Sequence, residues 1–299
     1  ILALDGRSMA EIVANEGFNA ALAASTVEFQ VQRPDNTEFI VSITKDVVTI
    51  DPVPQWRIID RGAGVPPVGY LELATFDSTA DPVFDTVFSA YVAAGVSHDI
   101  LDLRYNGGGL VSTAKLLGDY LGALANNGLV FSATQFNADR APANNSVEYF
   151  QALGNSLNLS KLAVIATGRT ASASELVTNS IGAYFDVAII GANTYGKPVG
   201  TIGLTFCEKL LRPTAFKTVN ALGEGEYFDG LPVDCPAADD LNVAVGATAD
   251  PNMVAALSYL NTGACPVAEA PDGQFKVESD FVDRPDLSGP AHREFAGAF

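Results

Sequence analysis

The sequence predicts an α/β protein with a mainly parallel sheet, preceded by a smaller β-rich part. From residue 68 onwards, short apolar stretches alternate with segments whose apolar residues recur at helical spacing, which is typical of βαβ units. Before residue 50, apolar and polar residues alternate in two runs joined by a turn. Hydrophobic residues make up 48% of the 299 residues and charged residues 17%, which is enough apolar material for a sizeable core.

The first 50 residues predict a β-hairpin. The stretches "TVEFQVQ" (26–32) and "EFIVSIT" (38–44) alternate in polarity, and "RPDNT" between them has the residues of a turn. The opening "ILALDG" is a short strand closed by an Asp-Gly turn. It reads as the middle of a strand, so we expect a preceding segment, with any targeting signal, to be missing from this chain. Residues 51–67 are rich in proline and predict a linker.

The main part of the chain, residues 68–268, alternates strands and helices. Strands are expected at 68–76, 99–106, 161–167 and 187–192, and helices at 81–95, 113–124 and 172–185. No internal repeat is visible in it. The last part, residues 269–299, is polar and contains proline, so it predicts an extended or poorly ordered arm.

The charge balance excludes some classes of partner. The formal net charge is −18, and such a surface repels nucleic acid and anionic membranes. No run of 18 apolar residues could span a membrane. With two histidines and no C-x-x-C pair, a metal site is poorly supported. Cys207, Cys235 and Cys265 allow three single disulfide pairings or three free thiols, and the sequence does not choose among them.

The stretch "TASASEL" (170–176) raises a question about Ser172. Ser172 and Glu175 stand in the S-x-x-E relation of a capping box, in which the serine hydroxyl and the glutamate carboxylate satisfy the first helical N–H groups. Ser172 is therefore either a plain helix cap or a nucleophile at the mouth of the helix.

Lys197 supplies a candidate base for such a nucleophile. It lies 25 residues after Ser172, beyond one helix and one strand that runs back towards the same edge of the sheet. A lysine desolvated there would have a lowered pKa and could act as a neutral amine, although a surface lysine after a strand is the ordinary alternative. Neither His98 nor His292 fits a Ser-His-Asp triad, so a serine hydrolase here would need lysine as its base.

A glycine run could provide backbone donors for the same chemistry. The apolar strand in "LDLRYNGGG" (101–109) ends in three glycines, whose N–H groups can face a ligand. Acyl transfer needs such donors for the oxyanion. Gly108 or Gly109 could contribute one, and the N–H of Ala173, at the positive end of a helix dipole, another.

These motifs together resemble the C-terminal-processing, or tail-specific, serine protease family. The family pattern of D-L-R-x-N-x-G-G, then S-A-S-E, then a Gly-Lys loop is matched by "DLRYNGGG" (102–109), "SASE" (172–175) and "YGKPVG" (195–200). The resemblance covers roughly residues 68–265 and extends to secreted bacterial members. It implies a ββα-spiral protease core, similar to that of crotonases and Clp proteases. Residues 1–50 resemble the later part of the PDZ domain that precedes this core.

The resemblance also implies roles and a setting. It implies a serine endopeptidase that acts on protein or peptide substrates through an acyl-enzyme, without cofactor or metal, in the periplasm or outside the cell, with membrane anchoring through a missing N-terminus as an alternative. Many relatives carry a Gln four residues after the lysine, and here that position is Thr201. The implied site consists of the nucleophile Ser172, the base Lys197, the oxyanion donors Gly108 or Gly109 and Ala173, and the supporting Glu175 and Thr201.

Three other functions stay open at this point. A catalytically weak peptide binder would keep the fold and the groove but hydrolyse slowly. A small-ester hydrolase would use the same acyl-enzyme chemistry. A crotonase-like acyl-CoA enzyme would share the sheet and the glycine turn, although the acidic surface disfavours an anionic cofactor.

Overall fold

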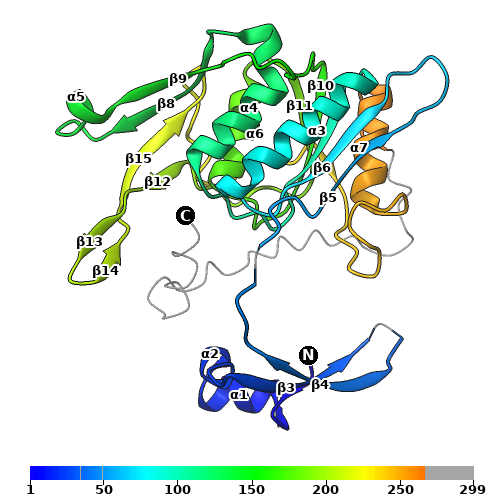
Figure 1. Cartoon of the computed structure of the whole chain (residues 1–299), viewed down its shortest axis with the longest axis vertical. Coiled ribbons are helices and arrows are strands. Elements are labelled where there is room, and N and C mark those ends of the chain that lie inside the picture. Colours follow the sequence, from blue (N-terminus) through cyan, green and yellow to red (C-terminus); the bar gives the residue numbers. More distant parts are fainter. Residues whose placement is uncertain (34, 49, 267–299) are drawn as a thin grey trace. The chain divides into compact units, whose positions relative to one another are not determined.

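The computed structural model describes residues 1–33, 35–48 and 50–266 (Figure 1). They form two compact units, the first Ile1–Ile50 and the second beginning at Asp51. The arm expected at 269–299 and His292 lie outside the described residues.

The first unit is a small four-stranded sheet with two short helices. Its strand order is β2-β1-β3-β4, and all the neighbours are antiparallel. The predicted hairpin is confirmed to the residue as β3 and β4. The helices were not predicted, although α1 begins at a capping box formed by Ser8 and Glu11. The elements are β1 (Ala3–Leu4), β2 (Arg7–Ser8), α1 (Met9–Asn15), α2 (Phe18–Ala21), β3 (Thr26–Gln32) and β4 (Glu38–Thr44).

The second unit is built on a six-stranded sheet of order β16-β11-β10-β7-β6-β5. The first five strands are parallel, as predicted, and β5 pairs antiparallel with β6 at the edge. The strands are β5 (Gln55–Ile59), β6 (Val68–Glu72), β7 (His98–Asp102), β10 (Lys161–Ala166), β11 (Asp186–Gly191) and β16 (Cys235–Pro236).

Strand β5 corrects the prediction that residues 51–67 are only a linker. The prolines lie at both ends of that segment, and "QWRII" is the five-residue stretch that directly follows the first two of them. These residues have the aromatic and β-branched side chains that favour a strand. The Trp56 ring packs edge-on against Tyr91, with the ring centroids 6.2 Å apart. Proline content alone therefore misled the prediction.

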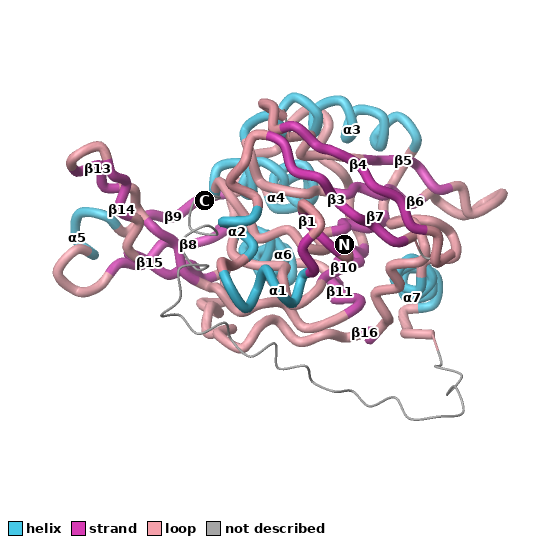
Figure 2. The backbone as a smooth tube through the Cα atoms, turned by 90° about the horizontal axis from the view of Figure 1, so that it is seen from below, coloured by secondary structure: helices cyan, strands magenta, loops and turns pink. Residues whose placement is uncertain are grey.

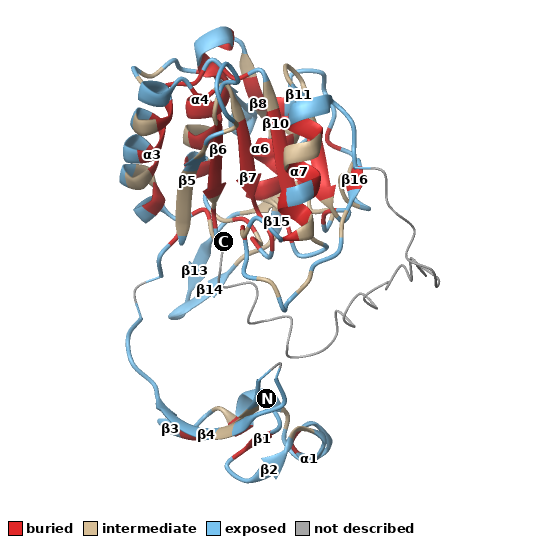
Figure 3. Ribbon diagram, turned by 90° about the vertical axis from the view of Figure 1, so that its right-hand side faces the viewer, coloured by how far each residue is buried: buried red, intermediate tan, exposed pale blue. Residues whose placement is uncertain are grey.

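Helices cover both faces of this sheet. On one face, α3 (Asp81–Ala94, after the short η1, Ser78–Ala80), α4 (Val111–Asn126) and α6 (Ala173–Gly182) bury a core against Leu71, Leu101 and Val164. On the other face, α7 (Pro251–Thr262) packs on residues that include Ile100 and Ile190. Figure 2 shows α3 and α7 on opposite sides of β6 and β7, and Figure 3 shows these strands as buried.

The second unit also contains a smaller, four-stranded sheet. Its order is β12-β15-β8-β9, and all the pairs are antiparallel. Figure 1 shows it, with a separate hairpin of β13 and β14, on the side of the unit away from α7. The elements are β8 (Val130–Phe136), α5 (Ala141–Asn144), β9 (Ser146–Tyr149), β12 (Val199–Thr201), β13 (Leu204–Phe206), β14 (Lys209–Leu211) and β15 (Thr214–Val219).

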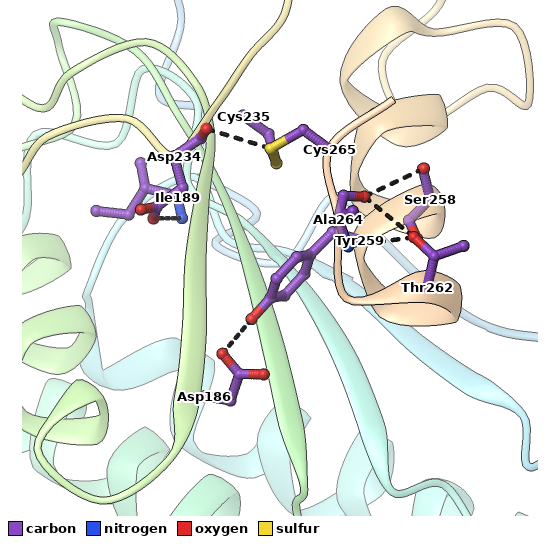
Figure 4. Close-up of a disulfide and its surroundings, with 9 residues drawn as sticks. All are labelled: Asp186, Ile189, Asp234, Cys235, Ser258, Tyr259, Thr262, Ala264 and Cys265. Atoms are coloured by element: carbon purple, nitrogen blue, oxygen red, sulfur yellow. Dashed lines mark hydrogen bonds between the residues drawn. A yellow bond between two sulfur atoms is a disulfide. The ribbon is translucent and has the colours of Figure 1, made fainter. Parts of the chain in front are cut away.

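One disulfide resolves the question that the three cysteines left open. Cys235 in β16 is bonded to Cys265 just after α7, whereas Cys207 is an exposed free thiol (Figure 4). Tyr259 of α7 also reaches Asp186 of β11 through a hydrogen bond in the same region (Figure 4). The disulfide therefore fastens α7 to the edge of the sheet. Among the described residues, no helix is long and apolar enough to cross a membrane.

Candidate active site

Ser172 lies where strand β10 gives way to helix α6. It is the N-cap residue of α6, and its backbone has φ 57° and ψ −113°. A residue with a Cβ rarely adopts this left-handed region, and holding it there costs about 1–3 kcal/mol. The surrounding contacts must supply that energy, and strain of this kind concentrates at functional sites.

Lys197 lies on the loop between β11 and β12, at the edge where β10 and β11 end. Ser172 and Lys197, which the sequence predicted to be close, line one pocket. Burial lowers the pKa of Lys197, and the carboxylate of Glu175 opposes that shift. The residues that line the pocket are Val111, Ser172, Ala173, Leu176, Lys197, Val199, Gly200, Phe216 and Thr218.

The carboxylate of Glu175 connects the serine and the lysine segments. It accepts the Ser172 N–H at 2.9 Å and the Lys197 N–H at 2.8 Å. It also accepts the Gly196 N–H at 2.7 Å and the Thr194 hydroxyl at 2.5 Å. The side chain is fully buried. Burial raises the pKa of Glu175, and the four hydrogen bonds to the carboxylate oppose that rise.

Glu175 therefore does more than complete a helix cap. It uses the capping-box bond to the Ser172 N–H and, with its other interactions, ties the lysine loop to the first turn of α6. The backbones of Ser172 and Lys197, which are 25 positions apart in sequence, are thus both held by the Glu175 side chain.

The glycine run lies directly against the serine. A Cβ added to Gly108 would be 2.8 Å from both the Ala173 nitrogen and the Ser172 Cβ, so only glycine allows this approach. The Gly108 N–H, however, donates to Asn106 Oδ1 at 2.9 Å. The N–H groups of Gly109 and Ala173 have no hydrogen bond to any described residue. Of the two glycines considered for oxyanion binding, Gly109 is thus the one with an unengaged N–H group.

Asn106 holds the glycine run in place, a role that the sequence analysis did not assign. Its Nδ2 donates to the Leu73 carbonyl at 2.7 Å. Its carbonyl accepts the Ala171 N–H and the Ser174 hydroxyl, each at 3.0 Å. The side chain is fully buried. The sequence signal that could have indicated this role is the position of Asn106 in "LDLRYNGGG", between the strand and the glycines.

Other predicted residues lie elsewhere. Thr201 is half-buried on β12, beside an irregularity in the β12–β15 pairing, and it is not among the residues that line the pocket. His98 begins β7, at the opposite end of the strand from the glycine run, where Nδ1 lies 2.7 Å from the Arg61 guanidinium. The structure also adds Phe216 and Thr218 of β15 to the pocket, and nothing in their sequence context marked them.

Fold and pocket together define the class of protein. It is an α/β protein in which a serine at a helix N-terminus, the following residue Ala173 with its unengaged N–H group, and a desolvated lysine line one pocket, groups that Ser-Lys hydrolases use. Residues 67–224, more than half of the chain, match the peptidase family S41. The chain belongs to peptidase family S41, a family of serine-type peptidases.

Curated relatives match over part of their length. The chain is 31% identical over 176 residues to the chloroplastic C-terminal processing peptidase of Tetradesmus obliquus, covering 55% of this chain and 35% of that protein. It is 28% identical over 204 residues to a carboxyl-terminal-processing protease of Picosynechococcus, covering 66% and 45%. The matches thus span less than half the length of these relatives.

Solved structures share the fold. The structure of a candidate S41 protease from Bacteroides fragilis superposes with a TM-score of 0.72 at 24% identity, covering 87% of this chain and 72% of that one. The photosystem II D1 C-terminal processing protease superposes with a TM-score of 0.55 at 22% identity, covering 84% and 68%. These likenesses confirm the mixed α/β fold that was predicted.

Proposed function

We propose that this chain is a serine endopeptidase in which Ser172 is the nucleophile and Lys197 the general base. The observation that supports this most strongly is the Glu175 carboxylate, which binds the backbone N–H of both residues and keeps them at one pocket. Membership of a serine-type peptidase family makes peptide bonds the substrate class.

The mechanism follows from the groups in the pocket. Neutral Lys197 takes the proton of the Ser172 hydroxyl, and the serine oxygen adds to the scissile carbonyl carbon. The resulting oxyanion accepts hydrogen bonds from the N–H groups of Ala173 and Gly109. When the C–N bond breaks, the Lys197 ammonium returns its proton to the leaving amine. Lys197 then activates a water that hydrolyses the acyl-enzyme and regenerates the serine.

The selection of substrates and the cellular setting are part of the same proposal. The two curated relatives are named for C-terminal processing, and the first unit has an edge strand, β4, that could accept a substrate tail as an added strand. The Cys235–Cys265 disulfide favours an oxidising compartment, so we place the protein in the periplasm or outside the cell. Thr201 remains a proposed supporting residue, acting through its hydroxyl.

The test is digestion of casein by four proteins: wild type, Ser172→Ala, Lys197→Ala and the control Lys209→Ala, whose side chain is exposed on the β14 hairpin. We expect cleavage only by wild type and the control. Because the base must be unprotonated and burial lowers its pKa, the wild-type rate should rise with pH through that lowered pKa and then level off.

Other outcomes would change the assignment. A rate that is flat from pH 5 to 9 would exclude lysine as the base. Hydrolysis of a nitrophenyl ester without cleavage of casein would make the protein a small-ester hydrolase. Peptide affinity that survives in Ser172→Ala, with no cleavage by wild type, would indicate a binding protein.

A further inference from the structure

A buried hydroxyl beside the pocket has no assigned role. The oxygen of Tyr227 is shielded from solvent and has no hydrogen-bond partner among the described residues. A buried hydroxyl without a hydrogen-bond partner destabilises the folded protein, so its retention needs a reason. Burial raises the pKa of Tyr227, the Glu175 carboxylate adds to the rise, and the Thr218 hydroxyl opposes it. The hydroxyl therefore lies close to two groups of the site.

The turn before Tyr227 is fixed to the helix that begins at Ser172. Asn179 on α6 donates from Nδ2 to the Glu224 carbonyl at 3.0 Å, and Asn220 donates from Nδ2 to the Asn179 carbonyl at 3.2 Å. Gly225 lies so close to β15 that an added Cβ would be 2.3 Å from the Thr218 carbonyl oxygen. The position of Tyr227 relative to α6 and β15 is thus set by these side-chain hydrogen bonds and by the close approach of Gly225 to β15.

The segment after Tyr227 packs on the lysine loop. A Cβ added to Gly196 would be 2.3 Å from the Phe228 carbonyl oxygen. The Leu231 N–H donates to the Thr194 hydroxyl at 2.7 Å, and that hydroxyl donates to Glu175 at 2.5 Å. Tyr227 is therefore held between α6, β15 and the loop that carries the base.

Thr218 lies between Tyr227 and the lysine. Its N–H donates to the carbonyl of Pro198, the residue after Lys197, at 2.9 Å. Its side chain lines the pocket with Ser172 and Lys197, and it is buried, with 5% of its surface exposed. Its hydroxyl donates to the Pro198 carbonyl at 3.5 Å, which is long for a hydrogen bond. The hydroxyl oxygen can therefore also take part in a shorter hydrogen bond with another group.

We propose that Thr218 and Tyr227 are positioning residues for the base: Thr218 Oγ1 accepts a hydrogen bond from the Lys197 amine, and the Tyr227 hydroxyl donates to Thr218. This proposal rests on the assignment of Lys197 as the general base. A neutral amine can take the serine proton only if its lone pair points at Ser172, which requires its N–H groups to be held elsewhere. The pair also stabilises the ammonium once the proton has moved, because an acceptor favours the charged form.

The test measures kcat, KM and the pH profile of kcat/KM on a peptide cleaved by wild type. For Thr218→Val we expect kcat to fall at least tenfold with KM changed less than twofold. The pH at which the lysine limb rises should move down, because an acceptor that favours the ammonium has been removed. Tyr227→Phe should change both quantities in the same direction by a smaller factor. Thr218→Ser should restore both, since it keeps the hydroxyl.

Matched controls separate this role from a structural one. Thr134 is the partner of Thr218 in the β8–β15 pairing and Tyr149 is exposed on β9, so Thr134→Val and Tyr149→Phe repeat the same chemical changes outside the pocket. Both should keep the wild-type kcat and pH limb. Glu175, which also acts on the pKa of Lys197, is unchanged in every variant. Fluorescence of the single tryptophan, Trp56, checks that each variant is folded.

The outcomes are distinguishable from failure of the proposed function. Suppose that wild type cleaves and Ser172→Ala does not, but Thr218→Val and Tyr227→Phe keep the wild-type kcat and the wild-type pH at which kcat/KM rises. The positioning role is then wrong, whereas the assignment as a serine peptidase is supported. A loss of kcat with an unmoved pH limb and no rescue by Thr218→Ser would show a structural role and also overturn it. If Ser172→Ala cleaves as fast as wild type, both proposals fall together.

Discussion

The stability of the second unit should depend on the ionisation of Asp99. This residue lies on β7 with 0% of its surface exposed, and neither carboxylate oxygen has a hydrogen-bond partner among the described residues. Its Oδ1 would be 2.3 Å from a Cβ added to Gly69, so the carboxyl lies directly against the neighbouring strand β6. Burial raises the pKa of Asp99 to about 7, and the Ile100 N–H opposes this only in part.

The magnitude follows from linkage. The ordinary value is 3.8, so a rise to about 7 corresponds to about 3 pKa units, or roughly 4 kcal/mol at about 1.4 kcal/mol per unit. Because the folded protein holds the proton more tightly than the unfolded chain, this stability is fully present below pH 3.8 and is lost as the pH rises to about 7. Roughly half of it, about 2 kcal/mol, is lost between pH 5.5 and pH 8.5.

Asp99→Asn removes the ionisation and should remove this slope. The measurement is urea unfolding at pH 5.5 and pH 8.5, followed by Trp56 fluorescence, since the Trp56 ring contacts Tyr91 close to the site. The asparagine amide carries its own burial cost, but that cost does not depend on pH. The difference between variant and wild type should therefore shift by about 2 kcal/mol in favour of the variant from the lower to the higher pH.

An exposed control completes this test. Asp139 lies on the surface after β8, and Asp139→Asn should leave the pH dependence of the unfolding free energy as it is in wild type. If Asp99→Asn and wild type differ by the same amount at both pH values, the buried carboxyl does not titrate with a raised pKa, and the reasoning fails.

Two further predictions concern the glycine run and the disulfide. Gly108→Ala should abolish casein cleavage and also lower the urea midpoint, because Gly108 is buried at φ 105° and the new methyl would lie 2.8 Å from the Ala173 nitrogen. Cleavage at a tenth of the wild-type rate or more would show that the glycine is not needed for the approach. Cys235→Ser should lower the unfolding free energy by about 3–4 kcal/mol, the chain-entropy value for a closed loop of 30 residues, and dithiothreitol should do the same to wild type; equal midpoints with and without the bond would contradict this.

Most strands of the main sheet, and the proximity of Ser172 and Lys197, could be predicted from the sequence. Strands β6, β7, β10 and β11 are apolar runs with clear turn signals, and their parallel order follows from the helices between them. The meeting of Ser172 and Lys197 could be predicted because a helix and a strand return the chain to the same sheet edge. The glycine run follows β7, which pairs parallel with β10, the strand that precedes Ser172. The run therefore lies at the same edge of the sheet as Ser172.

The remainder depended on contacts that local patterns do not encode. Thr218 reaches the pocket only because β15 pairs with both β8 and β12, and that register is set by residues far apart, such as Phe216 opposite Phe136. Tyr227 is positioned by the turn before it, in which the Glu224 carbonyl accepts a hydrogen bond from Asn179 of α6. The engaged state of the Gly108 N–H depends on a side-chain rotamer of Asn106, which a spacing rule cannot give. Strand β5 was missed because the composition of a 17-residue window concealed five strand residues.

The loop that carries Lys197 is also the bridge from the large sheet to the small one, since it runs from β11 directly into β12. Ser172 stands at the helix-covered large sheet, whereas Lys197 stands on the connection to the antiparallel small sheet. Phe131 of β8 lies in the same core as Leu101 of β7, so the small sheet is anchored in the core of the large one. Any change in how the small sheet packs would therefore alter both the separation of Ser172 and Lys197 and the stability of the second unit, so activity and stability should change together.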